Sequence, residues 1–273
     1  MPFVGRPDGV ELYWEERGEG PAIVVANQFF APLEVFDGLM DLLAERHRLV
    51  TYDPRGIGRS TPRGPYDLAT DAGDLGGLIE ATCNEPAVVV SMGDGSNRAV
   101  RLAVARPELV AAVVCVAGNP VNRVAGEGGE GLAASDSVIE ALLSMMETDY
   151  RSALRTMIST ANPNLDAEAV RARVAASAER CPQEAAAPRM RSWIEDDAVE
   201  HSVALGDRLW ILDDGTNPWF LETIKRTAEL LPEAHVHAVE NGAVSRPDIA
   251  ARFIGELTGV GDTAGARVSG SSG

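Results

Sequence analysis

The sequence contains no apolar run that approaches the roughly 20 residues a membrane-spanning helix needs. Its first residues, MPFVGRPDG, lack the basic and then apolar order of a secretory signal. Positive charge is also scarce, because 24 lysines and arginines stand against 41 aspartates and glutamates, a net charge of −17. A surface of that sign repels phosphate, so we expect neither nucleic acid nor a membrane as a partner, and we predict a cytoplasmic protein.

Cysteine is scarce as well. Cys83, Cys115 and Cys181 are far apart and odd in number, which argues against a disulfide framework and does not match the spacing of a metal site. The glycine-rich turns lack Gly-Lys-Ser/Thr and the spacing of the dinucleotide fingerprint. We therefore predict reduced thiols, no metal and no cofactor. The oligomeric state stays open, with a homodimer as one option.

What the chain does contain is a regular alternation of strand and helix patterns. Strands are predicted over residues 10–15, 22–27, 48–53, 86–91, 110–118, 208–214 and 235–240, and helices over 35–47, 66–83, 97–107, 219–231 and 248–259. The first strand alternates in polarity like an edge strand, whereas continuous apolar runs such as AIVVAN are typical of strands covered on both faces. This order predicts an α/β fold with a mostly parallel, doubly wound sheet.

The alternation is interrupted after Gly118-Asn119-Pro120, where helical stretches follow one another without a convincing strand. We predict an α/β core over residues 1–118 and 208–262, an all-helical lid over 119–207, and a disordered tail over 263–273. Met145 and Met146 are expected to pack inside the lid. The acidic stretch WIEDDAVE, residues 193–200, is either a solvated helix face or the source of a carboxylate that faces a pocket.

One short segment predicts a sharp strand-to-helix turn. It reads VVVSMGDGSNRAV, and in a large class of enzymes such a turn carries the catalytic nucleophile. The positions two before and two after the apex must be small. Ser91-Met92-Gly93-Asp94-Gly95 meets that condition with Gly93 at the apex, whereas an apex at Ser91 would place Val89 at a flank. Glycine tolerates the strained backbone of such a turn, so the turn can persist without a nucleophile.

Three stretches carry a family resemblance, namely DGVELYWEERGEGPAIVV, YDPRGIGRS (52–60) and RLAVARPELVAAVVCVAG (101–118). They resemble the α/β-hydrolase fold superfamily, in its lidded, epoxide-hydrolase-like and haloperoxidase-like form, and the resemblance extends over about residues 9–259. It implies an α/β-hydrolase fold with a helical lid. It also implies an elbow nucleophile, a backbone oxyanion hole, an acid after the strand that follows the lid, and a histidine after the last strand.

The resemblance places different residues at the three triad positions. Gly93 stands at the nucleophile position, and Asn217 stands at the acid position, with Asp213 and Asp214 as alternatives at the strand end. Val244, or Ala243 beside it, stands near the histidine position. The triad is therefore expected to be degenerate.

Of the four histidines, only His201 lies where it could reach the pocket, and a solvated residue of the lid is the alternative interpretation.

The oxyanion turn of the family corresponds to Asn27-Gln28-Phe29. The predicted substrate-binding residues are Asn27, Gln28, Phe29, Met92, Gly93, Trp219 and Val244. Met92 either lines the roof of the pocket or packs beneath the elbow. Asp94 either caps the following helix together with Ser96 or faces the pocket as a base.

Three functional hypotheses follow from these assignments, each with a small organic molecule as the partner. The first is triad-independent, non-hydrolytic chemistry (isomerisation, cyclisation, elimination or rearrangement), with Asp94, Ser91 and Asn217 as candidate catalytic groups. The second is a non-catalytic small-molecule binder or sensor. The third is a residual ester-type hydrolase that uses Ser91.

Overall fold

The computed structural model describes residues 2–30, 33–121, 136–162, 164–196, 198–215 and 218–260. Within them one sheet has the strand order β1-β2-β4-β3-β5-β6-β7-β8. The strands are β1 (Phe3–Gly5), β2 (Glu11–Arg17), β3 (Ala22–Ala26), β4 (Arg48–Tyr52), β5 (Ala87–Ser91), β6 (Val110–Val116), β7 (Leu209–Asp214) and β8 (His235–Val239). Every neighbouring pair from β4 to β8 is parallel, whereas β1 and β2 run antiparallel to their neighbours.

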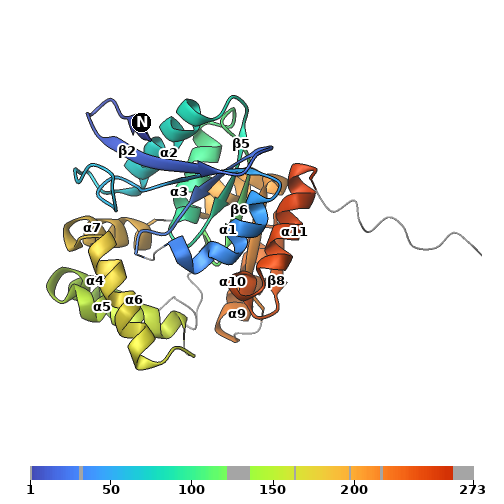
Figure 1. Ribbon diagram of the computed structural model, residues 1–273. Helices are drawn as coiled ribbons and strands as arrows, with labels where there is room; N and C mark the ends of the chain where they lie inside the picture. Colours follow the sequence, from blue (N-terminus) through green and yellow to red (C-terminus); the bar gives the residue numbers. More distant parts are fainter. Residues whose placement is uncertain are drawn as a thin grey trace, which may run out of the picture.

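Helices cover both faces of this sheet, and a separate group lies to one side of it (Figure 1). The helices are α1 (Asp37–Ala44), α2 (Leu68–Thr82), α3 (Gly95–Ala105), α4 (Asp136–Thr148), α5 (Tyr150–Ala161), α6 (Ala167–Arg180), α7 (Gln183–Ile194), α8 (Val199–Leu205), α9 (Pro218–Leu230), α10 (Gly242–Ser245) and α11 (Pro247–Thr258), with short 3-10 helices η1 (Leu33–Phe36) and η2 (Gly206–Arg208). The predicted α/β class is confirmed, with its mostly parallel, doubly wound sheet.

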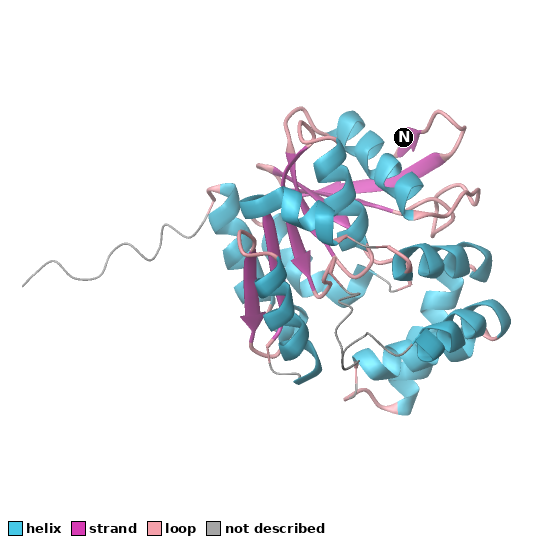
Figure 2. Ribbon diagram, turned by 180° about the vertical axis from the view of Figure 1, so that it is seen from behind, coloured by secondary structure: helices cyan, strands magenta, loops and turns pink. Residues whose placement is uncertain are grey.

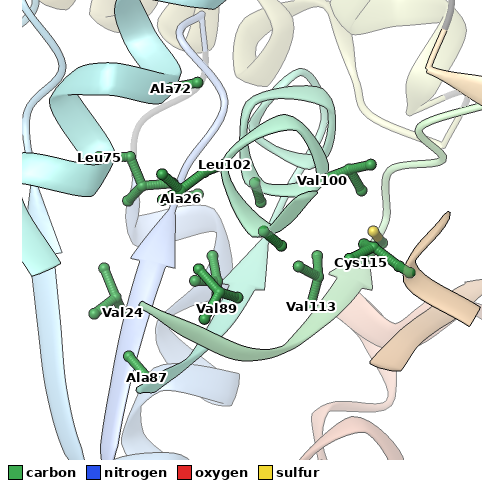
Figure 3. Close-up of a cluster of buried hydrophobic side chains, with 14 of the residues drawn as sticks. Val24, Ala26, Ala72, Leu75, Ala87, Val89, Val100, Leu102, Val113 and Cys115 are labelled. Atoms are coloured by element: carbon green, nitrogen blue, oxygen red, sulfur yellow. The ribbon is translucent and has the colours of Figure 1, made fainter. Parts of the chain in front are cut away.

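The continuous apolar runs are explained by helices on both sides of the central strands. Successive residues of a strand point to opposite faces, so Val24 and Val89 pack under α2 and α3, whereas Val25 and Val90 pack under α1 and α11. Figure 3 shows the first of these clusters, with the strand valines below Leu102 of α3. Burial of each such side chain contributes about 1.5–3 kcal/mol.

The lid helices α4 to α7 form their own group beside the sheet (Figure 2). Their apolar faces meet in a third cluster that contains Leu154, Val174 and Met146, and half-buried Met145 packs against it. Phe29 and Ile57 of the sheet domain join the same cluster, so the lid and the core share buried apolar contacts.

Three details differ from the sequence-based expectation. Residues 10–15 are not the edge of the sheet, because β1 pairs outside β2; three residues are too few for an alternating pattern to reveal the extra strand. Residues 182–202, which fall within the predicted helical lid and have helical composition throughout, are divided into α7 and α8. Helix α8 packs against α3, and its Leu205 belongs to the cluster under the sheet rather than to the lid cluster.

Two further expectations concern the C-terminal tail and membrane-spanning helices. The predicted tail over 263–273 lies outside the described residues. Among the described helices, none combines the length and the hydropathy that crossing a bilayer requires.

Candidate functional site

The turn between β5 and α3 has the geometry of a sharp elbow, and glycines pack it tightly. Gly93 adopts a left-handed φ of 54° at its apex. A Cβ on Gly95 would lie 1.9 Å from the carbonyl oxygen of Ala26, and a Cβ on Gly118 would lie 2.4 Å from the Gly93 nitrogen. These approaches are between backbone atoms, so the turn needs glycine at both flanking contacts.

The side chain of Gln28 lies against the bare α-carbon at the apex. A Cβ on Gly93 would lie 2.8 Å from Gln28 Oε1 and 2.9 Å from Gln28 Cβ. The space that the first atom of a nucleophilic side chain would need is therefore taken by the glutamine. Gln28 is half-buried, and its carboxamide offers both hydrogen-bond donors and an acceptor at this point.

The backbone N–H groups of the neighbouring turn are used internally. The N–H of Phe29 donates to Asp94 Oδ1 at 2.9 Å, and the N–H of Gln28 donates to Asn27 Oδ1 at 2.8 Å. In acyl-transfer enzymes an oxyanion hole needs N–H groups that point at the developing negative charge. Here an internal carboxylate already holds the Phe29 donor.

Asp94 is 1% exposed, and its second oxygen is also paired. Asp94 Oδ2 lies 3.0 Å from Arg98 Nη2, and the same guanidinium donates to the carbonyl of Asn27. Burial raises the pKa of Asp94, while Arg98 and the Phe29 N–H act in the opposite direction. Of the two interpretations of Asp94, the capping role with Ser96 is wrong, because its side chain makes no cap bond to α3 and instead ties α3 to the 27–29 turn.

Ser91 and Met92 both point away from the apex. Ser91 is fully buried, and its Oγ lies 3.1 Å from Ser96 Oγ beneath α3. Burial raises the pKa of the adjacent Cys115 thiol to about 11, with hydrogen bonds from Ser91 and Ser96 opposing that rise. Met92 is fully buried in the cluster on the α1 and α11 face, so it packs beneath the elbow rather than lining a roof.

Three of the four histidines have contacts far from the elbow in the fold. His47 is buried, and its Nε2 lies 2.7 Å from Thr258 Oγ1 of α11. His235 and His237 begin β8 and stack on Trp210, with ring centroids 4.0 and 5.7 Å apart.

His201, the remaining histidine, lies on a different helix from Val244, the residue near the family's histidine position. His201 lies half-buried in α8, which packs against α3. After β8 the chain forms the short α10, in which Ala243 is buried and Val244 is 37% exposed.

The family's acid position corresponds to the connection between the end of β7 and the start of α9. Asp213 is buried at the end of β7, and Trp219 falls in the first turn of α9. The predicted residue Asn217 lies outside the described residues.

The comparison with protein families is decisive about the fold. A family model described as "alpha/beta hydrolase fold" matches residues 21–220. The chain belongs to the α/β-hydrolase fold family.

The curated relatives are matched over only part of their own length. The "Probable oxidoreductase EphD" of Mycobacterium tuberculosis is 39% identical over 100 residues, which cover 34% of this chain and 17% of that protein. The 2-(acetamidomethylene)succinate hydrolase of Mesorhizobium japonicum is 28% identical over 165 residues, which cover 60% of this chain and 57% of the relative.

Solved structures of similar shape show the fold over nearly the whole chain. An esterase from Exiguobacterium antarcticum has a TM-score of 0.81 at 15% identity, with 94% of this chain and 98% of the esterase covered. The bottromycin epimerase BotH, in complex with bottromycin A2, has a TM-score of 0.69 at 15% identity, with the same coverage.

One lid anchor in this α/β-hydrolase chain was missed by sequence reasoning. Asp196, from the acidic stretch 193–200, is buried rather than solvated and accepts a hydrogen bond of 2.8 Å from Asn97 Nδ2. Asp196 also pairs with Arg101, and Trp193 Nε1 donates to Asn97 Oδ1 at 3.1 Å. These contacts fasten the end of α7 to the helix that follows the elbow.

A surface hollow of about 680 Å³ lies elsewhere, against Trp14 and Glu16 of β2 and Asp37 of α1. It shares no residue with the elbow, so the site proposed below does not include it.

The tight packing of the elbow predicts opposite effects for two glycines. Gly95→Ala places a methyl group against backbone that cannot move aside, and it should lower the free energy of unfolding by about 3 kcal/mol or more. Gly73→Ala is the matched control, because a Cβ there meets nothing within 4 Å inside α2. It should raise the free energy of unfolding by about 0.5–1 kcal/mol. Urea unfolding measures both; an equal effect of the two substitutions would contradict the described turn.

The paired carboxylate predicts that Asp94 matters for stability. Asp94→Asn leaves the fully buried Arg98 without its nearest counter-charge and should cost about 3–5 kcal/mol of unfolding free energy. Glu108→Gln, which breaks the exposed pair with Arg106, should cost less than about 1 kcal/mol. A neutral effect of Asp94→Asn in urea unfolding would mean that the carboxylate is not held as described.

Proposed function

We propose that this chain binds a small organic molecule between the elbow and the lid and acts on it without a nucleophile–acid–histidine triad. The step would be non-hydrolytic: an isomerisation, cyclisation, elimination or rearrangement. The observation that carries the proposal is the side chain of Gln28, which fills the place of a nucleophile beside Gly93.

Triad hydrolysis needs a nucleophile paired with a base and donors for the oxyanion, and this chain is poorly suited to both. A nucleophile must be within hydrogen-bond reach of its base, yet the apex is glycine and the position after β8 carries Val244. Donors must be offered to the oxyanion, yet the N–H of Phe29 is bonded to Asp94. Loss of a single triad member already removes most of the acceleration in such enzymes.

The polar groups at the elbow could position a substrate and polarise its bonds. The Gln28 carboxamide can donate to a carbonyl or accept from a hydroxyl of the substrate. A lid that excludes water strengthens such contacts and can hold a reactive molecule close to its transition-state shape, which is sufficient for some rearrangements. A solved structure of the same fold, BotH, is named as an epimerase, so the fold is not restricted to proteins named as hydrolases.

A generic ester assay tests the absence of hydrolysis. With p-nitrophenyl acetate, wild type and Ser91→Ala should give the same slow rate, lower than that of a triad esterase by a factor of about 10⁴ or more. The reason is that Ser91 is bonded to Ser96 beneath α3. Turnover by wild type that disappears in Ser91→Ala would instead support the residual hydrolase.

The second candidate function is a non-catalytic binder or sensor. It is favoured by the fact that two predicted catalytic groups, Asp94 and Ser91, are already held by internal partners.

A metabolite screen separates the enzyme from the binder. Compounds that raise the melting temperature saturably are recovered after incubation and analysed by mass spectrometry and NMR. The enzyme predicts a product, including an isomer of unchanged mass, whose formation slows about tenfold or more in Gln28→Ala because a polarising hydrogen bond is lost. Recovery of every stabilising compound unchanged would reject the catalytic proposal and support the binder.

A further inference from the structure

A buried ionic contact joins the lid to the core below it. Arg189 of α7 donates to Asp71 of α2 through two hydrogen bonds, of 2.6 and 2.8 Å, and to the carbonyl of Arg55 at 2.7 Å. Arg189 and Asp71 are both almost completely buried. A two-pronged guanidinium–carboxylate contact in such a setting is strong and geometrically specific.

The same carboxylate also faces a second arginine. Asp71 Oδ2 lies 3.6 Å from Arg98 Nη1, and Arg98 in turn binds Asp94 and the carbonyl of Asn27. Positive and negative groups therefore alternate without interruption from Arg189 in the lid to Asp94 at the elbow. The last contact in the series is the N–H of Phe29 on Asp94 Oδ1.

We propose that Arg189 and Arg98 are positioning residues that couple the docking of lid helix α7 to the placement of the Asn27–Gln28–Phe29 turn over Gly93. When Arg189 is seated, it satisfies Asp71, and Arg98 is left to hold Asp94 and Asn27. When Arg189 is withdrawn, the buried Asp71 draws Arg98 toward itself, because an uncompensated charge in the interior is costly. The hold of Arg98 on the turn then weakens, and the Asp94–Phe29 contact loosens with it.

This coupling depends on contacts between described residues and not on any reaction at the elbow. It holds whether the pocket catalyses or only binds, so its failure would leave the proposed function standing.

Helix α7 also supplies a matched control. Arg191 lies two residues after Arg189 but is 46% exposed, and it pairs with Glu147 of the lid at 2.8 Å. Removal of Arg191 deletes an arginine and an ion pair from the same helix without touching Asp71.

Amide hydrogen exchange measured by NMR tests the coupling in the full chain. In Arg189→Leu the Phe29 amide should exchange about tenfold faster or more than in wild type, because its acceptor is no longer fixed. The amides of Val24 and Val25 in the central strand β3 report global unfolding, and their exchange should rise by a smaller factor. In Arg191→Leu all three amides should exchange as in wild type.

Two results would overturn the proposal. The first is a Phe29 amide that responds no more to Arg189→Leu than to Arg191→Leu. The second is a Phe29 amide that accelerates only in step with Val24 and Val25, which would indicate general destabilisation. If Arg189→Leu does not fold, Arg189→Lys replaces it, because lysine keeps the charge but lacks the planar fork. It should give a smaller but selective acceleration at Phe29, and no selective acceleration would overturn the proposal equally.

Discussion

Arg98 lies completely inside the protein, and the charge of a buried guanidinium must be compensated by the chain around it. Asp94 and Asp71 supply the counter-charges, and the carbonyl of Asn27 supplies a further acceptor. Asp94 and Asp71 in turn raise the pKa of Arg98, against the lowering effect of burial, so the arginine stays charged. The position of the elbow, of the turn above it and of helix α2 all depend on this one arrangement.

The same arrangement determines what the site can do. Asp94 lies at the position after the apex, but its carboxylate is directed to Phe29 and Arg98. That contact uses a backbone donor of the kind that an ester hydrolase needs for its oxyanion. It also brings the adjacent Gln28 side chain against Gly93. The polar groups of this turn therefore hold the elbow, helix α3 and the 27–29 turn together.

Much of the fold followed from pattern alone, because buried parallel strands leave unambiguous apolar runs. Strands β2 to β8 all fall on predicted segments, and the lid helices fall where strand patterns ceased. Strand β1 was not predicted, because a strand of three residues is too short to show an alternating pattern of polarity. The break between α7 and α8 was missed because both sides of it have helical composition.

The site was harder to predict, because its contacts join residues that are far apart in the sequence. The spacing of Asp94 and Arg98 by four residues is visible in a helix pattern, but Asp94 was interpreted only as a helix cap or as a base that faces the pocket. Asp71 and Arg189 are separated by 118 residues, and no local signal joins them. The place of the Gln28 side chain is likewise fixed by packing against Gly93 and not by its neighbours in sequence. The proposed assignments at Asn217 and Val244 remain predictions.

The central claim is that the elbow presents no activated nucleophile, and reaction with a fluorophosphonate tests it most directly. Such reagents form a stable bond with a serine that a neighbouring base activates, and intact-mass spectrometry reads the result for the whole protein. The account predicts an unchanged mass after prolonged incubation, in conditions where a triad esterase in the same tube is fully modified. A stoichiometric adduct located on a serine of this chain, Ser91 above all, would contradict it.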